Sequence, residues 1–167
     1  MVNRPISFIT VKKWFYVILK NHYSNQSVFF GETENDVKQE QLELYKTGRV
    51  GANDGGIDFV LKPLGKFFQA TEVLDFGKYF LDIDKISRFP ITFVVKSTKS
   101  ESECLKILRD KATEEYELEI VEKYMNAIEK IFRTPDLIEM VKNAVKNHQI
   151  SNLLDDFIEY YKTEFNF

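Results

Sequence analysis

The fold is decided by the stretch GGIDFVLKPLGKFFQATEVL, residues 55–74. Residues 57–62 and 67–74 are rich in apolar, β-branched and aromatic side chains, which predicts two strands. Between them, Pro63-Leu64-Gly65 is a combination typical of tight turns. The stretch therefore predicts a two-stranded hairpin at the centre of the domain.

One carboxylate stands in the apolar first strand of this hairpin. Burying Asp58 there costs free energy unless its side chain is paired or binds a cation. The turn brings Asp58 near Gln69 in the second strand, and Thr71 shares the face of Gln69 because strand side chains alternate. Glu72 falls on the opposite face unless a bulge intervenes. Asp58 is therefore expected to lie near Gln69 and to need a partner or a bound cation.

The segments around the hairpin predict alternating helices and strands. A helix is expected over residues 34–46, with Thr33 as N-cap and acidic residues in its first turn. Four of the seven glycines follow in residues 48–56, which predicts a loop. Residues 75–88 favour a short helix, and the β-branched run 91–96 predicts a buried strand.

The ends of the chain look mostly helical. Residues 11–20 predict an amphipathic helix, and residues 28–30 a short strand or a buried turn. Ser100-Glu101-Ser102-Glu103 fits a capping box, and the apolar stripe after it predicts one helix of more than 25 residues. The stripe consists of Leu108, Ala112, Tyr116, Ile120, Tyr124, Ile128 and Ile131. Further helices are expected from Thr134-Pro135 and from Ser151.

The order of these features resembles the PD-(D/E)xK nuclease superfamily, to which restriction endonucleases belong. The resemblance covers about residues 34–96 and rests on a glutamate-bearing helix, a glycine-rich loop, Gly-Gly-Ile-Asp, a turn and a strand with glutamine. It implies that Asp58, Gln69 and the helix residue Glu40 hold Mg²⁺, with Mn²⁺ as a possible substitute. The implied reaction is metal-assisted hydrolysis of a phosphodiester bond in double-stranded DNA.

The sequence departs from the family at one catalytic position. Thr71 stands where the family usually carries a lysine, and a hydroxyl supplies no positive charge to the reacting phosphate. The alternatives are a lysine from elsewhere, with candidates Lys62, Lys66 and Lys96, or an altered or inactive site. A shifted register would also make Glu72 a candidate ligand.

The expected fold is α/β (α+β), a restriction-endonuclease-like core in which helices flank a central mixed sheet, with a helical C-terminal third. We expect one nuclease-like domain over residues 1–167, with its core at about 33–97 and a helical extension at about 100–167. The expected function is that of a Mg²⁺-dependent endodeoxyribonuclease of the type II restriction kind. A palindromic target would imply a homodimer. The alternative is an inactive nuclease-fold protein that binds nucleic acid or a protein partner.

Composition limits these hypotheses. The net charge is −3, which leaves open a regulatory protein unrelated to nucleic acids, although a local basic surface is compatible with an acidic remainder. Cys104 is the single cysteine, so internal disulfides are excluded, and we expect a buried structural thiol. The first residues lack a signal-type apolar run, and no apolar stretch reaches membrane-spanning length. A cytoplasmic protein is expected.

Overall fold

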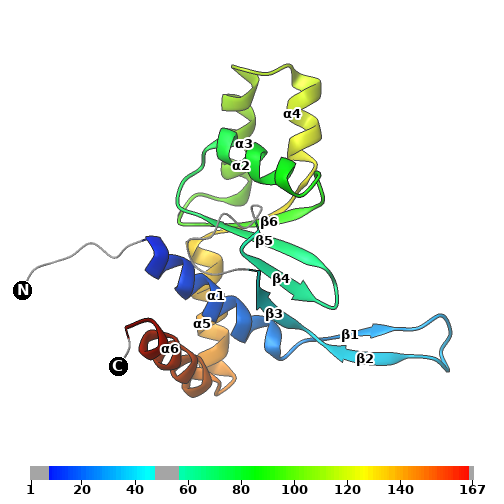
Figure 1. Ribbon diagram of the computed structural model, residues 1–167, viewed down its shortest axis with the longest axis vertical. Helices are drawn as coiled ribbons and strands as arrows, with labels where there is room; N and C mark the ends of the chain where they lie inside the picture. Colours follow the sequence, from blue (N-terminus) through cyan, green and yellow to red (C-terminus); the bar gives the residue numbers. More distant parts are fainter. Residues whose placement is uncertain (1–7, 48–56, 166–167) are drawn as a thin grey trace, which may run out of the picture. The chain divides into compact units, whose positions relative to one another are not determined.

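The computed structural model describes residues 8–47 and 57–165, and it has the architecture of an α/β protein (Figure 1). Five strands form a mixed sheet in the order β3-β4-β5-β6-β7, and a separate two-stranded sheet joins β1 and β2. No helix within the described ranges is long and apolar enough to cross a lipid bilayer.

The predicted central hairpin is confirmed. Strand β4 (Phe59–Lys62) pairs antiparallel with β5 (Lys66–Thr71), and Phe59 stands opposite Phe68. Gly65, in the turn between the strands, has a φ of +65°, a conformation that glycine adopts without steric cost. Both strands are shorter at their outer ends than the sequence predicts.

The hairpin is followed by a helix and a strand, both of which were also predicted. Helix α2 (Phe76–Lys85) begins after Asp75, whose carboxylate accepts a hydrogen bond from the backbone N–H of Lys78 at 3.2 Å. Strand β6 (Ile91–Val95) then pairs parallel with β5, and all five of its residues are buried. A strand that is buried on both faces has a continuous run of apolar residues, and this run allowed β6 to be predicted from the sequence.

The prediction of one long helix after residue 100 is wrong. The capping box at Ser100 is confirmed and starts α3 (Glu101–Thr113), but α4 (Leu118–Met125) is a separate helix. Residues 128–132 form strand β7 (Ile128–Phe132), which is parallel to β6. Apolar residues four apart fit both a helical stripe and the alternation of a strand, so the spacing alone could not separate the two. The C-terminal part is therefore helical, as predicted, except for strand β7, which separates α4 from the helices that begin at Thr134.

The predicted helix over residues 34–46 is also wrong. Strand β1 (Ser27–Phe30), which the sequence predicted, pairs antiparallel with β2 (Lys38–Gln41), and β3 (Glu43–Lys46) follows. Leu42 and Leu44 are buried while Glu43 between them is exposed, which is the alternation of a strand. The acidic residues at 32–36 resembled a first helical turn but precede a strand.

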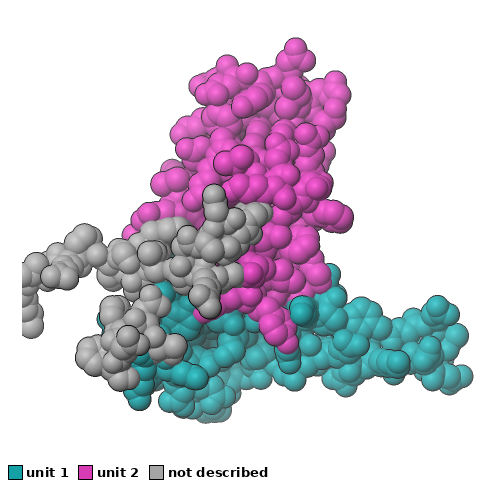
Figure 2. Space-filling view, viewed as in Figure 1, with its two compact units in different colours: residues 1–44, 62–64, 137–167 teal, residues 45–61, 65–136 magenta. Residues whose placement is uncertain are grey.

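The chain forms two compact units that interleave in sequence (Figure 2). Unit 1 comprises residues 1–44, 62–64 and 137–167, and unit 2 comprises residues 45–61 and 65–136. The expectation of a single domain with its core at residues 33–97 stays a prediction. The candidate site lies within unit 2, whose core joins α2, α3 and α4 to the sheet.

Unit 1 is built mainly from three helices that the sequence predicted. They are α1 (Phe8–Ser24), α5 (Thr134–Lys146), which starts within unit 2, and α6 (Ile150–Phe165). The rings of Trp14 and Phe157 lie 4.1 Å apart between α1 and α6. Lys20 and Asp156 form an ion pair of 2.9 Å between the same two helices. Apolar packing and this ion pair together hold α1 against α6.

Candidate functional site

Asp58 lies just before β4 and is bonded to the hairpin through both its backbone and its side chain. Its backbone N–H donates to the carbonyl of Phe68 at 2.9 Å, and its carbonyl accepts from the N–H of Thr47 at 3.1 Å. Its carboxylate Oδ2 accepts a hydrogen bond of 2.8 Å from the backbone N–H of Ala70. The carboxylate thus acts as a ladder acceptor at the end of the β4–β5 pairing and is held against β5.

Gln69 lies on the face of the sheet that α2 covers. In the parallel pairing of β5 and β6, Gln69 stands beside Phe93, so the two side chains share a face. The ring of Tyr79, from α2, stacks on Phe93 with centroids 3.9 Å apart. Only 8% of Gln69 is exposed, and its side-chain oxygen Oε1 has no hydrogen-bond partner among the described residues.

The carboxylate of Asp58 reaches β5 next to Gln69. The paired residues of β4 and β5 begin with Phe59 and Phe68, and the backbone N–H of Asp58 donates to the carbonyl of the same Phe68, so Asp58 departs from the regular register. The hydrogen bond from the N–H of Ala70 holds the carboxylate against the backbone of β5, one residue from Gln69. A buried acceptor without a partner costs about 1–3 kcal/mol, so the position of Gln69 needs an explanation.

Thr71 and Glu72 contribute no charged group to the buried surroundings of Gln69. Thr71 is completely buried, and its hydroxyl donates to the carbonyl of Val73 at 3.2 Å. Glu72 is exposed immediately after β5. The position of the family lysine is therefore filled by a short side chain bonded to its own chain.

Helix α2 adds two buried polar residues that the sequence reasoning missed. Asp82 is 3% exposed, and its Oδ1 accepts from the ammonium of Lys85 at 3.2 Å. The other carboxylate oxygen of Asp82 and the hydroxyl of Tyr79 have no hydrogen-bond partner within the described part of the chain. The available signal was the spacing of Lys78, Asp82 and Lys85, four and three residues apart, which puts them on one side of a helix.

The charge of Asp58, next to the hairpin strand β4, affects the pKa of Asp82 on α2. Burial raises the pKa of the Asp82 carboxyl, the ion pair with Lys85 counteracts this in part, and the negative charge of Asp58 raises the pKa further. The hydroxyl of Tyr79 has a strongly raised pKa, mainly because of burial and also because of Cys104 and Asp82. Asp58 is therefore close enough for its charge to disfavour the charged form of Asp82.

The lysine candidates lie at opposite ends of the sheet. Lys66 pairs with Leu61 beside the turn and forms an ion pair with Glu129. The five steps along the strand from Lys66 to Thr71 span about 16 Å. Lys96 is exposed and follows Val95, which stands beside Thr71 in the parallel ladder. Of the predicted candidates, Lys96 follows the C-terminal end of β6, beside the C-terminal end of β5 where Thr71 lies. Lys66 and Lys62 lie at the hairpin turn.

Glu40 was predicted as a metal ligand because it was expected to lie on a helix, and that expectation is wrong. Glu40 does not lie on a helix but in the middle of β2, exposed and paired with Val28. It belongs to unit 1, whereas Asp58 and Gln69 belong to unit 2. The helix glutamate of the family has no counterpart at this position.

The donors at the site suit a hard divalent cation. Among the residues that the structure describes, no three histidine, cysteine, aspartate or glutamate side chains gather in a way that could hold a metal ion. Mg²⁺, however, commonly takes only one or two carboxylates together with other oxygens and waters. The oxygen of Gln69 and the second carboxylate oxygen of Asp82 are both buried and lack a partner in the described ranges, so the residues fit such an ion.

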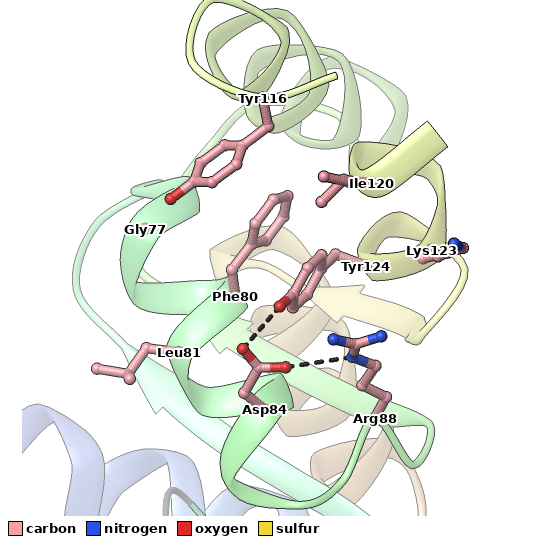
Figure 3. A pocket seen from close by; sticks show the side chains of 9 residues that line it. All are labelled: Gly77, Phe80, Leu81, Asp84, Arg88, Tyr116, Ile120, Lys123 and Tyr124. Atoms are coloured by element: carbon pink, nitrogen blue, oxygen red, sulfur yellow. Dashed lines mark hydrogen bonds and ion pairs between the residues drawn. The ribbon is translucent and has the colours of Figure 1, made fainter. Parts of the chain in front are cut away.

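A separate pocket of about 590 Å³ lies on the other side of α2, between this helix and α4 (Figure 3). Its polar groups are already bonded to one another. Asp84 accepts from the hydroxyl of Tyr124 at 2.6 Å and from Arg88 at 3.2 Å, and Arg88 lies over the Tyr124 ring. None of the residues predicted for the site lines this pocket.

Cys104 is buried at the start of α3, as predicted. Burial raises the pKa of its thiol, against the weaker opposite effect of a contact with the hydroxyl of Ser97. A thiol in this environment is a core side chain rather than a nucleophile.

No protein-family model, no curated protein and no solved structure matches the chain. The functional argument therefore rests on the residues of unit 2 described above.

Proposed function

We propose that this protein is a Mg²⁺-dependent endodeoxyribonuclease that hydrolyses phosphodiester bonds in double-stranded DNA. The observation that carries the proposal is the buried side-chain oxygen of Gln69, which has no partner among the described residues, one residue before Ala70, whose N–H donates to the carboxylate of Asp58. A bound cation would satisfy that oxygen and balance the charge of Asp58.

The residues of the chain have separate tasks in this proposal. Asp58 and the carbonyl oxygen of Gln69 would hold the cation, and the hydrogen bond from Ala70 fixes one oxygen of the Asp58 carboxylate. When bound, Mg²⁺ supplies polarisation of the phosphoryl oxygen and lowers the pKa of bound water. Lys96, at the same edge of the sheet as Thr71, supplies the positive charge that Thr71 lacks.

The order of elements supports the resemblance to the PD-(D/E)xK superfamily. The hairpin, a helix and a strand parallel to the second hairpin strand follow one another as the resemblance implies. Within this proposal the protein is a restriction endonuclease of type II, and a palindromic target would require a homodimer.

Cleavage of DNA by the purified chain tests the proposal. Duplex DNA is incubated with the protein at low salt, where phosphate contacts are strongest, with Mg²⁺, with Mn²⁺ or with chelator. We expect metal-dependent cuts that Asp58→Asn abolishes and that Asp110→Asn, a change on the exposed side of α3, leaves unchanged. Cleavage that persists in chelator or in Asp58→Asn would overturn the proposal.

A second candidate function is a nuclease-fold protein that binds DNA without cutting it. The observation in its favour is Thr71, which is buried and bonded to the carbonyl of Val73 at the position of the family lysine. DNA binding of equal affinity in the wild type and in Asp58→Asn, together with no cleavage in Mg²⁺ or Mn²⁺, would establish this function instead.

A further inference from the structure

Helix α2 has two polar sides with different surroundings. Asp84 lies on the side toward α4, where it is exposed and bonded to Tyr124 and Arg88 (Figure 3). Asp82 is two residues earlier, which corresponds to about 200° around a helix of 3.6 residues per turn. Asp82 therefore lies on the side of α2 turned away from α4.

One carboxylate oxygen of the buried Asp82 lacks a partner among the described residues. Carboxylates are rarely buried unless they are paired or coordinate a metal. Lys85 engages one carboxylate oxygen of Asp82, whereas the other has no hydrogen-bond partner within the described ranges. The same holds for the side-chain oxygen of Gln69.

Packing places α2 over the part of the sheet that carries Gln69. Tyr79 precedes Asp82 by three residues, and its ring stacks on Phe93, which stands beside Gln69 in the sheet. Residues three apart lie on one side of a helix, so Asp82 is on the sheet-facing side of α2, in agreement with its burial. The negative charge of Asp58 also contributes to the raised pKa of Asp82.

We infer that α2 contributes Asp82 as the second carboxylate ligand of a divalent cation held by Asp58 and the carbonyl oxygen of Gln69. This inference rests on the proposed function, because it concerns the same cation. Two carboxylates and one amide oxygen, with waters at the remaining positions, form a donor set that suits Mg²⁺ or Mn²⁺. The carboxylate from α2 takes the place of the helix glutamate, since Glu40 lies on β2 in unit 1.

Lys85 opposes the cation in this arrangement. Its ammonium pairs with one oxygen of Asp82 and so competes with a cation for that carboxylate. Its positive charge also repels the cation. Removing that charge should therefore tighten cation binding rather than weaken it.

Calorimetric titration of the full chain with Mn²⁺ tests the inference without relying on activity. The variants are Asp58→Asn, Asp82→Asn, and the matched control Asp84→Asn on the opposite side of the same helix. We expect one site in the wild type, loss of that site in Asp58→Asn, and an affinity at least about tenfold weaker in Asp82→Asn. Asp84→Asn should bind as the wild type does.

The possible results separate this inference from the proposed function. Normal Mn²⁺ affinity in Asp82→Asn, or equal weakening in Asp82→Asn and Asp84→Asn, overturns the role of Asp82 while a site at Asp58 still supports the nuclease. Absence of Mn²⁺ binding in the wild type overturns both.

A further variant tests the role of Asp82 even if Asp82→Asn does not fold. Lys85→Met keeps both carboxylates and removes a partly exposed charge, so the fold should tolerate it. We expect a severalfold tighter Mn²⁺ affinity in Lys85→Met. An unchanged or weaker affinity contradicts the assignment of Asp82 as a ligand.

Discussion

The backbone N–H of Ala70 donates a hydrogen bond of 2.8 Å to the carboxylate Oδ2 of Asp58. This bond gives Asp58 a structural task at the end of the β4–β5 ladder in addition to the proposed metal site. A loss of activity in any Asp58 variant must therefore be separated from a loss of stability.

Two substitutions of Asp58 make this separation. Asp58→Ala removes the acceptor of the partly buried Ala70 N–H, and we expect the free energy of unfolding to fall by about 1–3 kcal/mol. Asp58→Asn keeps an acceptor oxygen of the same shape and removes the charge, so stability should change by less than about 1 kcal/mol while cleavage is lost. Urea unfolding followed by circular dichroism measures both values. Equal destabilisation by the two substitutions would show that the charge, not the hydrogen bond, stabilises the hairpin.

The protein should be more stable when Tyr79 loses its hydroxyl. Tyr79→Phe keeps the ring that stacks on Phe93 and removes a buried hydroxyl that has no partner among the described residues. We expect the free energy of unfolding to rise by about 1 kcal/mol, because the desolvation cost of the hydroxyl disappears. The same unfolding measurement checks this value. A decrease of similar size would mean that the hydroxyl has a bonding partner.

Lys96 and Lys66 should differ in their effect on cleavage. Lys66 lies beside the hairpin turn and is paired with Glu129, so Lys66→Met should leave the cleavage rate unchanged and cost at most about 1 kcal/mol of stability. Lys96 lies at the edge where Thr71 ends β5, and Lys96→Met should lower the rate at least about tenfold. Single-turnover cleavage of duplex DNA measures both rates. The reverse order of effects would move the site to the turn end of the hairpin.

The capping box of α3 should give stability that depends on pH. Ser100 accepts from the N–H of Glu103 at 3.2 Å, and Glu103 accepts from the N–H of Ser100 at 2.6 Å. Ser100→Ala should lower the free energy of unfolding by about 1 kcal/mol near neutral pH.

Acid should reduce this difference between Ser100→Ala and the wild type. The hydrogen bonds from Ser100 lower the pKa of Glu103, so its stabilising effect is full above the ordinary glutamate pKa. The effect is lost as the pH falls through the lowered value. Unfolding curves between pH 3 and pH 7 check this, and a constant difference across that range would show that Glu103 takes no part.

The sequence predicted those parts of unit 2 that have local signals. The hairpin was marked by Pro63 and Gly65, β6 by its apolar run, and α3 by its capping box. The segment over residues 34–46 was mistaken for a helix because its acidic start outweighed the alternation around Leu42 and Leu44. The strand β7 was hidden by an apolar spacing of four, which helices and strands share.

The candidate site was only partly predictable for a related reason. A turn joins the segments that carry Asp58 and Gln69, so the approach of Asp58 to β5 followed from the sequence, whereas the departure of Asp58 from the regular register did not. The position of Asp82 depends on how α2 is rotated over the sheet, and this rotation is set by the stacking of Tyr79 on Phe93. Such tertiary packing has no signal in the local pattern.

The position of a bound Mn²⁺ ion tests the central claim most directly. Crystals of the protein soaked in Mn²⁺ would be examined by anomalous diffraction. The account predicts a peak at about 2.1 Å from an oxygen of Asp58 and from Oε1 of Gln69, with Asp82 as the third protein ligand. A peak elsewhere on the chain, or none at a Mn²⁺ concentration that supports cleavage, would contradict it.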